Sequence, residues 1–224
     1  MRTNLMNDIN AMASSLSSAS TWIGSRNPLG HLPSSQDDYV YEFYCYIRVL
    51  HDLHFNHLVV LNSGSGENKN KFPLKPALKS KGWARFDICE QSGTLLYQVC
   101  AGTKVRNTKF SQSLFAPDIS FQKHDATDDP TQNDVELIMD AKFKDGGGKL
   151  PIGVFREMAE FINSLETSNA SAIKITFQYL KDLKQNCLLT NGEISPKEED
   201  YCKIRAIRQV GNFAPGFSKF MTVG

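Results

Sequence analysis

The chain lacks several features that define whole classes of protein. No apolar segment in the 224 residues approaches the roughly 18 consecutive apolar residues of a membrane span, so we expect no membrane association. The first 20 residues are polar and rich in serine, without the apolar centre of a signal peptide. The five cysteines (45, 89, 100, 187 and 202) are odd in number and include no CxxC pair. They predict free buried thiols in a reducing cytoplasm, rather than a disulfide framework or a zinc ribbon.

An excess of charge is also absent, because the net charge is only +1. The distribution is uneven, however: residues 69–85 and 101–117 contain basic residues and no acid, whereas acids concentrate at 125–140 and 193–200. This asymmetry predicts a basic face that follows a phosphate backbone beside an acidic metal site; the alternative is a solvated loop with scattered lysines. The predicted nucleic-acid contacts are Lys69, Lys71, Lys75, Lys79, Lys81, Arg85, Lys104, Arg106 and Lys109. Phe72 and Trp83 are candidates for stacking on bases, or for packing under a loop.

The pattern along the chain predicts a core with two extensions. Residues 1–36 form a Ser-rich N-terminal extension with a short helix expected at 5–16, residues 37–191 form the core, and residues 192–224 form a C-terminal extension that packs on it. Apolar residues at helical spacing predict a helix over 39–53, with Asp37 and Asp38 at its N-cap. His51 and His54 in this helix are a candidate zinc pair, but no acid or cysteine completes the site.

Further along, the sequence alternates between strand and helix signals. A turn at Gln91-Ser92-Gly93 predicts a hairpin of strands 86–90 and 94–100. A helix is expected at 152–165, a strand at 187–190 and an edge strand at 204–210. Residues 172–185 fit either a helical stripe or an alternating strand, of which we favour the helix.

The most informative feature is a pair of short apolar segments, 116–121 and 135–143, separated by the polar loop 122–133. Each is predicted to be a strand. Asp140 and Lys142 then point to the same face, about 7 Å apart, and Asp118 comes from the neighbouring strand. Charges in an otherwise apolar strand are costly unless something compensates them, which favours a metal site. The alternative is structural, with Asp118 capping a turn and Asp140 and Lys142 forming a salt bridge. Glu136 shares their face but lies about 13 Å away along the strand, too far for the same ion.

Pro117-Asp118, followed after 21 residues by Asp140-Ala141-Lys142, resembles the motif of the PD-(D/E)XK nuclease superfamily. The resemblance covers about residues 38–191. It implies an α/β restriction-endonuclease-like core, a central mixed sheet flanked by helices in αβββαβ order. The family often places a metal-binding glutamate on the first helix, which corresponds here to Glu42. The resemblance therefore implies that Asp118, Asp140, Glu42 and the carbonyl of Ala141 hold Mg²⁺, or Mn²⁺ as a substitute, and that Lys142 orients the attacking water.

From this resemblance we expect a cytoplasmic, metal-dependent DNA endonuclease of a restriction or phage-defence type. Its size and the lack of a recognition domain favour a homodimer or a subunit of a larger defence complex. Two alternatives remain open: a nucleic-acid-binding or assembly subunit that uses the fold as a scaffold, and a junction resolvase or repair nuclease.

Overall fold

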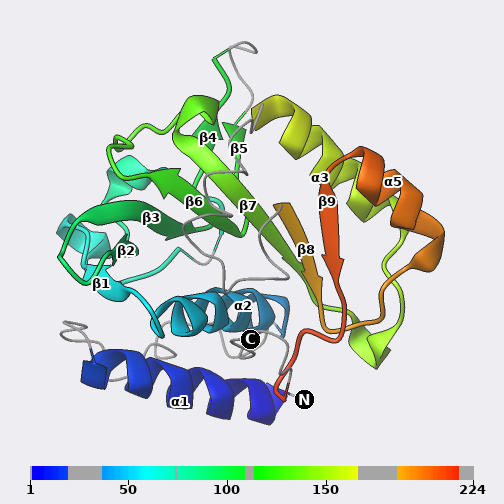
Figure 1. Ribbon diagram of the computed structural model, residues 1–224, viewed down its shortest axis with the longest axis horizontal. Coiled ribbons are helices and arrows are strands. Elements are labelled where there is room, and N and C mark those ends of the chain that lie inside the picture. The colour runs from blue at the N-terminus through cyan, green and yellow to red at the C-terminus, as the bar shows by residue number, and fades with distance from the viewer. Residues whose placement is uncertain (1, 20–36, 74, 109–113, 166–185, 217–224) are drawn as a thin grey trace.

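The computed structural model describes residues 2–19, 37–73, 75–108, 114–165 and 186–216. A seven-stranded mixed sheet forms its centre, with helices on both faces (Figure 1), so the fold class is α/β. The strands, in their order across the sheet, are β1 (Leu58–Asn62), β2 (Arg85–Cys89), β3 (Leu95–Ala101), β6 (Ile119–Lys123), β7 (Val135–Lys142), β8 (Asn186–Thr190) and β9 (Ile207–Val210). The helices are α1 (Arg2–Ala19), α2 (Asp37–Leu53), α3 (Ile152–Leu165) and α5 (Glu199–Ile204). A separate two-stranded ribbon pairs β4 (Val105–Arg106) with β5 (Leu114–Phe115).

The sheet changes direction at β7. The pairs from β1 to β7 are all antiparallel, whereas β8 is parallel to β7 and β9 is parallel to β8. Parallel neighbours need a long crossover connection, and α3 lies in the segment between β7 and β8. In the β6–β7 pair Ile119 lies opposite Met139, which sets Asp118 beside Asp140 at the end of the ladder. This register creates the site described below.

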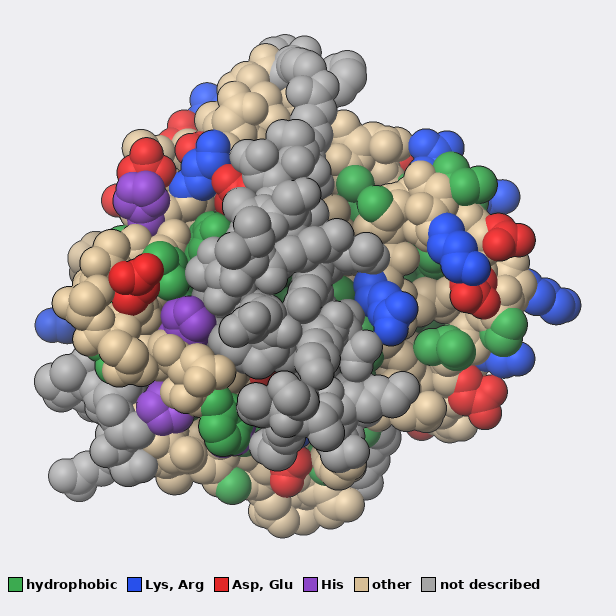
Figure 2. All heavy atoms as spheres, in the orientation of Figure 1, with side chains coloured by type: hydrophobic (Ala, Val, Ile, Leu, Met, Phe, Trp, Pro, Cys, Tyr) green, Lys and Arg blue, Asp and Glu red, His purple; other side chains and the backbone are tan. Residues whose placement is uncertain are grey.

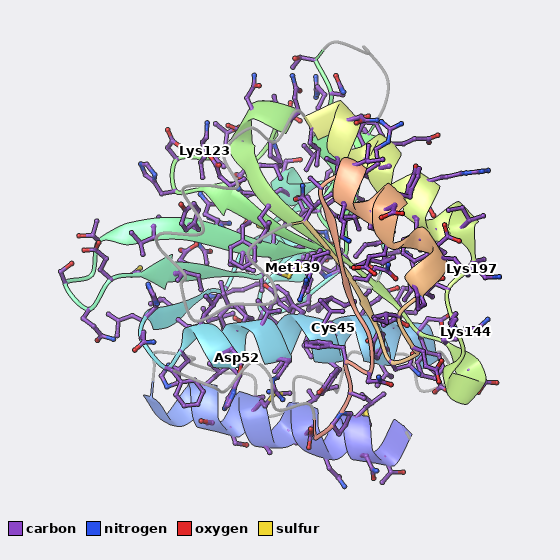
Figure 3. The ribbon with its side chains drawn as sticks, turned by 45° about the vertical axis from the view of Figure 1, so that its right-hand side comes forward. Cys45, Asp52, Lys123, Met139, Lys144 and Lys197 are labelled. Carbon is purple, nitrogen blue, oxygen red and sulfur yellow. The ribbon has the colours of Figure 1, made fainter. Side chains whose placement is uncertain are left out.

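Two apolar cores lie on the two faces of the sheet. Because side chains on a strand alternate between faces, Leu137, Met139 and Ala141 of β7 belong to the core under α2, whereas Ile138 belongs to the core under α3. Figure 3 shows Met139 and Cys45 of α2 in the space between sheet and helix. The central strand β7 therefore contributes to both cores.

Helix α2 is buried on most of its circumference because it lies between the sheet and α1 (Figure 1). From α1, Leu5, Ile9 and Leu16 are at most 1% exposed and complete the core on this side. A helix that is apolar on most sides is stable only when other elements pack against it on both sides, as the sheet and α1 do here. The Ser-rich extension thus supplies a layer of the fold through α1, which is longer than the helix expected at 5–16.

Most predicted elements appear with small shifts of their ends. The strand expected at 116–121 begins only at Ile119, because Pro117 has no N–H for the ladder. The edge strand expected from residue 204 begins at Ile207, since Ile204 still ends α5 and Ala206 adopts a positive φ of 54°. Strand β1 was not predicted, although the apolar run 58–61 was its signal. The helix favoured for 172–185 lies outside the described residues.

All five cysteines lie in described segments, and each is a buried free thiol, as the sequence predicts. Among the described helices, none combines the length and the hydropathy needed to cross a bilayer.

The first testable consequence concerns α1. Ile9→Ala is expected to lower the free energy of unfolding by about 2–5 kcal/mol, because it truncates a fully buried side chain in the core under α2. Urea denaturation measures this change. The exposed neighbour provides the control, and Asn10→Ala should stay within about 0.5 kcal/mol of wild type. Equal stability of both variants would mean that α1 does not pack on α2 in solution.

Candidate functional site

A pocket of about 400 Å³ opens at the end of the sheet where β3 and β7 end and β6 begins. We call it the carboxylate pocket, because Glu42, Asp118 and Asp140 line it together with Lys142. The four side chains that the sequence predicts to be catalytic, from α2, the start of β6 and the end of β7, therefore share one cavity. The other lining residues are Tyr39, Phe43, Tyr46, Asn70, Phe72, Pro73, Lys75, Pro76, Ala101, Gly102, Lys104, Leu114, Ala116, Glu157 and Phe161.

Asp118 is held in place by backbone groups on both of its neighbouring strands. Its carboxylate oxygen Oδ2 accepts a 2.7 Å hydrogen bond from the N–H of Ala141, and its carbonyl accepts one of 2.9 Å from the N–H of Gly102. Asp118 thus connects the end of β3 to the end of β7. Ala141, whose carbonyl is predicted to bind the ion, is 2% exposed, and its N–H is committed to Asp118.

Asp140 and Lys142 form an ion pair along one face of β7. The distance from Lys142 Nζ to Asp140 Oδ2 is 2.8 Å, and the two side chains are 31% and 8% exposed, respectively. Both the catalytic and the salt-bridge interpretation of the sequence contain this contact. What separates them is the number of other charges in the pocket.

The pocket is lined by the carboxylates of Glu42, Asp118, Asp140 and Glu157 and by the ammonium groups of Lys75, Lys104 and Lys142, of which Lys142 contacts Asp140. Burial raises the pKa of Glu42 to about 7; Lys142 opposes this rise and Asp140 adds to it. Burial also raises the pKa of Asp118 well above its usual range, and repulsion from Asp140 is the next cause. Burial alone would lower the pKa of Lys142, but attraction to Asp140 and Asp118 outweighs it and the pKa is raised. Burial and the charge of Asp140 therefore raise the pKa values of Glu42 and Asp118, and attraction to Lys142 does not cancel this rise.

A divalent cation suits this excess of negative charge, because Mg²⁺ binds through a few carboxylates and keeps several waters. Glu42, Asp118 and Asp140 supply suitable hard oxygen donors. As the side chains stand, however, no three His, Cys, Asp or Glu residues of the described segments are grouped so that they could hold an ion. One oxygen of each aspartate already has a partner, because Asp118 Oδ2 accepts from an N–H and Asp140 Oδ2 contacts Lys142. An ion would use the remaining oxygens or displace the ammonium of Lys142 from Asp140.

Two of the predicted phosphate contacts, Lys75 and Lys104, line the pocket. Backbone hydrogen bonds hold the two segments together, from Ala77 N to Gly102 O (2.9 Å) and from Lys104 N to Ala77 O (2.8 Å). Because the N–H of Gly102 also binds the carbonyl of Asp118, these lysines are tied to the acidic floor of the pocket.

The remaining predicted basic residues do not act as one surface. Lys69, Lys71 and Lys81 are exposed. By contrast, Arg106 pairs with Asp129 at 2.7 Å, and Arg85 lies 3.6 Å from Asp87. Lys109 lies outside the described residues. On the face drawn in Figure 2, outside its grey atoms, basic and acidic side chains intermingle over α3 and α5.

Lys79 does not belong to the predicted phosphate-binding set. It is only 5% exposed, and its ammonium donates to Gln98 Oε1 (2.7 Å), Gln122 Oε1 (3.1 Å) and the carbonyl of Ala126 (3.1 Å). The short helix Lys79–Lys81 turns this side chain inward, onto the sheet, while Lys81 stays exposed. Neither helix nor turn patterns in the sequence distinguish these two lysines.

Several pocket residues were not predicted. Glu157 and Phe161 lie one turn apart on α3, and Tyr39, Phe43 and Tyr46 lie on the face of α2 that carries Glu42. The spacing of four residues was the available signal, but it also describes an ordinary core-facing stripe. Tertiary packing alone brings the two helices to one cavity.

The other candidate residues lie away from the pocket. Figure 3 shows Lys123 and Lys144 at opposite ends of the β6–β7 pair; Glu136 lies at the Lys123 end, 3.9 Å from its ammonium, far from Asp118. His51 is 3.8 Å from Asp52, a contact within α2. The predicted zinc pair gains no further ligand among the described residues.

No family model, curated protein or solved structure matches this chain.

The burial of Lys79 gives a second testable consequence. Lys79→Met should lower the free energy of unfolding by about 3 kcal/mol, because it leaves the buried Oε1 atoms of Gln98 and Gln122 without their donor, whereas the carbonyl of Ala126 still accepts from Gln98 Nε2. Lys81→Met, two residues away and exposed, should change it by no more than about 0.5 kcal/mol. Urea denaturation of both variants separates the structural lysine from its solvated neighbour; similar values would place the Lys79 side chain in solvent.

A third consequence concerns pH. The pKa of Glu42 rises from 4.5 to about 7 on folding, so the folded state holds a proton that the unfolded state releases, and the free energy of unfolding falls as pH rises between these values. Because the side chain is partly solvated, we expect Glu42 to account for about 1–2 kcal/mol of this fall. Urea denaturation between pH 5 and 8 should show a shallower fall for Glu42→Gln. The control Glu160→Gln, exposed on α3, should keep the wild-type slope, and an unchanged slope in Glu42→Gln would contradict the burial of the Glu42 carboxyl described here.

Proposed function

We propose that the protein is a metal-dependent endodeoxyribonuclease of the PD-(D/E)XK type that uses Mg²⁺, with Mn²⁺ as a substitute. The observation that carries this proposal is the grouping of Glu42, Asp118, Asp140 and Lys142 in one pocket, where Glu42 and Asp118 accompany the ion pair of Asp140 and Lys142. A purely structural salt bridge needs one acid and one base. It gives no reason for two more acids, with raised pKa values, in the same space.

The order of elements also supports the proposal. Within the larger sheet, the subset α2, β3, β6, β7, α3 and β8 runs in αβββαβ order, with β8 parallel to β7. In this arrangement β1 and β2 extend the sheet on one side and β9 extends it on the other. The restriction-endonuclease-like core is thus a proposed part of the observed α/β fold.

Different residues of the pocket would have different roles in phosphodiester hydrolysis. Mg²⁺ bound by Asp118, Asp140 and Glu42 would supply charge stabilisation and lower the pKa of water. Lys142 orients the attacking water and offsets the negative charge that develops on the phosphate, since its ammonium stands beside Asp140 at the floor. Lys75 and Lys104 at the wall attract the DNA backbone. We place this activity in restriction or phage defence, in the cytoplasm, carried out by a homodimer or by a subunit of a larger complex.

One observation favours a second candidate, a nucleic-acid-binding or assembly subunit that keeps the fold as a scaffold. The 2.8 Å ion pair occupies an oxygen of Asp140 and the ammonium of Lys142 at the same time. If this pair never opens, the pocket binds DNA through its lysines without turnover.

Cleavage of supercoiled plasmid and of circular single-stranded DNA tests the proposal. With Mg²⁺ or Mn²⁺ the wild-type protein should cut at least one of these circles, and a chelator should abolish the cutting. Asp140→Asn and Lys142→Met should reduce the rate at least about 100-fold, because each removes a group that acts on the reacting phosphate. The matched controls Asp145→Asn and Lys149→Met change exposed residues outside the carboxylate pocket and should keep the wild-type rate.

A thermal melt with and without Mg²⁺ distinguishes the remaining outcomes. Stabilisation of wild type, but not of Asp140→Asn, would report binding of the ion by the pocket. DNA binding without cleavage under any metal would favour the scaffold. A protein that neither cuts nor binds DNA, and that Mg²⁺ does not stabilise, would leave the structural salt bridge as the interpretation.

A further inference from the structure

Segments of the chain enclose the carboxylate pocket on several sides, and this limits the size of the molecule that can reach its acids. Asp140 at its floor has a side chain only 8% exposed. The walls come from α2, from residues 70–73 and 75–76, from residues 101–104 and from α3, which lie on different sides of the sheet end. At about 400 Å³ the cavity has the size of a small-molecule site and is far smaller than a groove that would accept a double helix.

Aromatic rings form much of the wall. Phe72 packs against Phe43 with ring centroids 5.5 Å apart and against Tyr46 at 5.7 Å, so these three rings make one continuous apolar surface. Tyr39 on α2 and Phe161 on α3 are half-exposed and line the pocket from the two helices that cover opposite faces of the sheet. Phe43, Tyr46 and Phe72 are at most 8% exposed and support the wall from behind, so Tyr39 and Phe161 are the rings accessible to a planar base. Stacking of this kind contributes about 1–3 kcal/mol for each base in single-strand binding.

Cations stand beside this aromatic wall. Lys104 and Lys75 line the same cavity, and the hydrogen bonds through Ala77 and Gly102 hold their segments against Asp118. Among the acids, Glu157 of α3 joins the three carboxylates, so cations and acids share the cavity with the rings. A nucleotide has the matching parts, a planar base for the rings and a phosphate for the lysines and a bound metal.

We infer that the carboxylate pocket receives one unpaired nucleotide, with its base against the aromatic wall and its phosphate toward Lys104 and Lys142. The substrate class is therefore single-stranded DNA, or DNA with an unpaired position, rather than a continuous duplex. In a continuous duplex the bases are paired and stacked, so a base can enter such a pocket only after it leaves the stack. This inference rests on the proposed nuclease function, of which it specifies the substrate.

Binding of DNA to a cleavage-impaired protein tests the inference without turnover. Fluorescence anisotropy compares a labelled 12-nucleotide single strand with its duplex, on Asp140→Asn protein with Mg²⁺. The single strand should bind at least tenfold more tightly. Adding Tyr39→Leu should weaken single-strand binding about tenfold by removing a stacking surface, and should leave duplex binding unchanged. The control Tyr201→Leu, on α5 and away from the pocket, should change neither value.

Phe161→Leu provides a second variant with the same expected loss, in case Tyr39→Leu does not fold. Equal or tighter binding of the duplex, no binding of either form, or unchanged single-strand binding in both aromatic variants would overturn the inference.

Cleavage by the wild-type protein separates this inference from the function on which it rests. Faster cutting of the single strand than of the duplex supports both. Metal-dependent cutting of the duplex alone supports the nuclease and overturns the unpaired nucleotide. Preferential binding of the single strand, without cleavage in any metal, supports the pocket's preference and contradicts the proposed nuclease.

Discussion

The register of β6 on β7 is the constraint on which the site depends. It places Asp118 next to Asp140, and the N–H of Ala141 then fixes the Asp118 carboxylate at 2.7 Å. A shift of one residue would turn Asp140 and Lys142 to the opposite face and bring Leu137 and Met139 out of the α2 core. Apolar burial on both faces therefore enforces the position of the acids, and the chemistry of the pocket follows from the packing of its neighbours.

The buried acids of the carboxylate pocket lower the stability of the folded state. Glu42 and Asp118 are buried beside Asp140 and cost stability when they are ionised, as their raised pKa values indicate. The two apolar cores offset this cost, with β7 shared between them. Acids with strongly raised pKa values in a pocket are typical of functional sites, and the proposed role of these acids as cation ligands rests on this pattern.

Local patterns in the sequence predicted the elements better than their assembly. The helix at 39–53 and the exact bounds of the helix at 152–165 could be predicted because amphipathic spacing is a local property of the sequence. The start of β6 was displaced by Pro117, and β1 was missed, although its apolar run was visible. Glu42, Asp118, Asp140 and Lys142 were predicted to come together, and they line one pocket. The aromatic wall and the inward turn of Lys79 depend on contacts between distant segments, which no single-sequence pattern encodes.

The double membership of β7 has a consequence for motion. A strand that belongs to two cores cannot separate from the sheet unless both helical layers loosen, so the segment that carries Asp140 and Lys142 should open only with the whole domain. The wall segments 70–73, 75–76 and 102–104 lie outside the sheet, and backbone hydrogen bonds from Gly102 to Asp118 and from Ala77 to Gly102 connect them to its end. Asp140 and Lys142 therefore stand on a strand that both cores hold in place, whereas Lys75 and Lys104 stand on segments outside the sheet and belong to neither core.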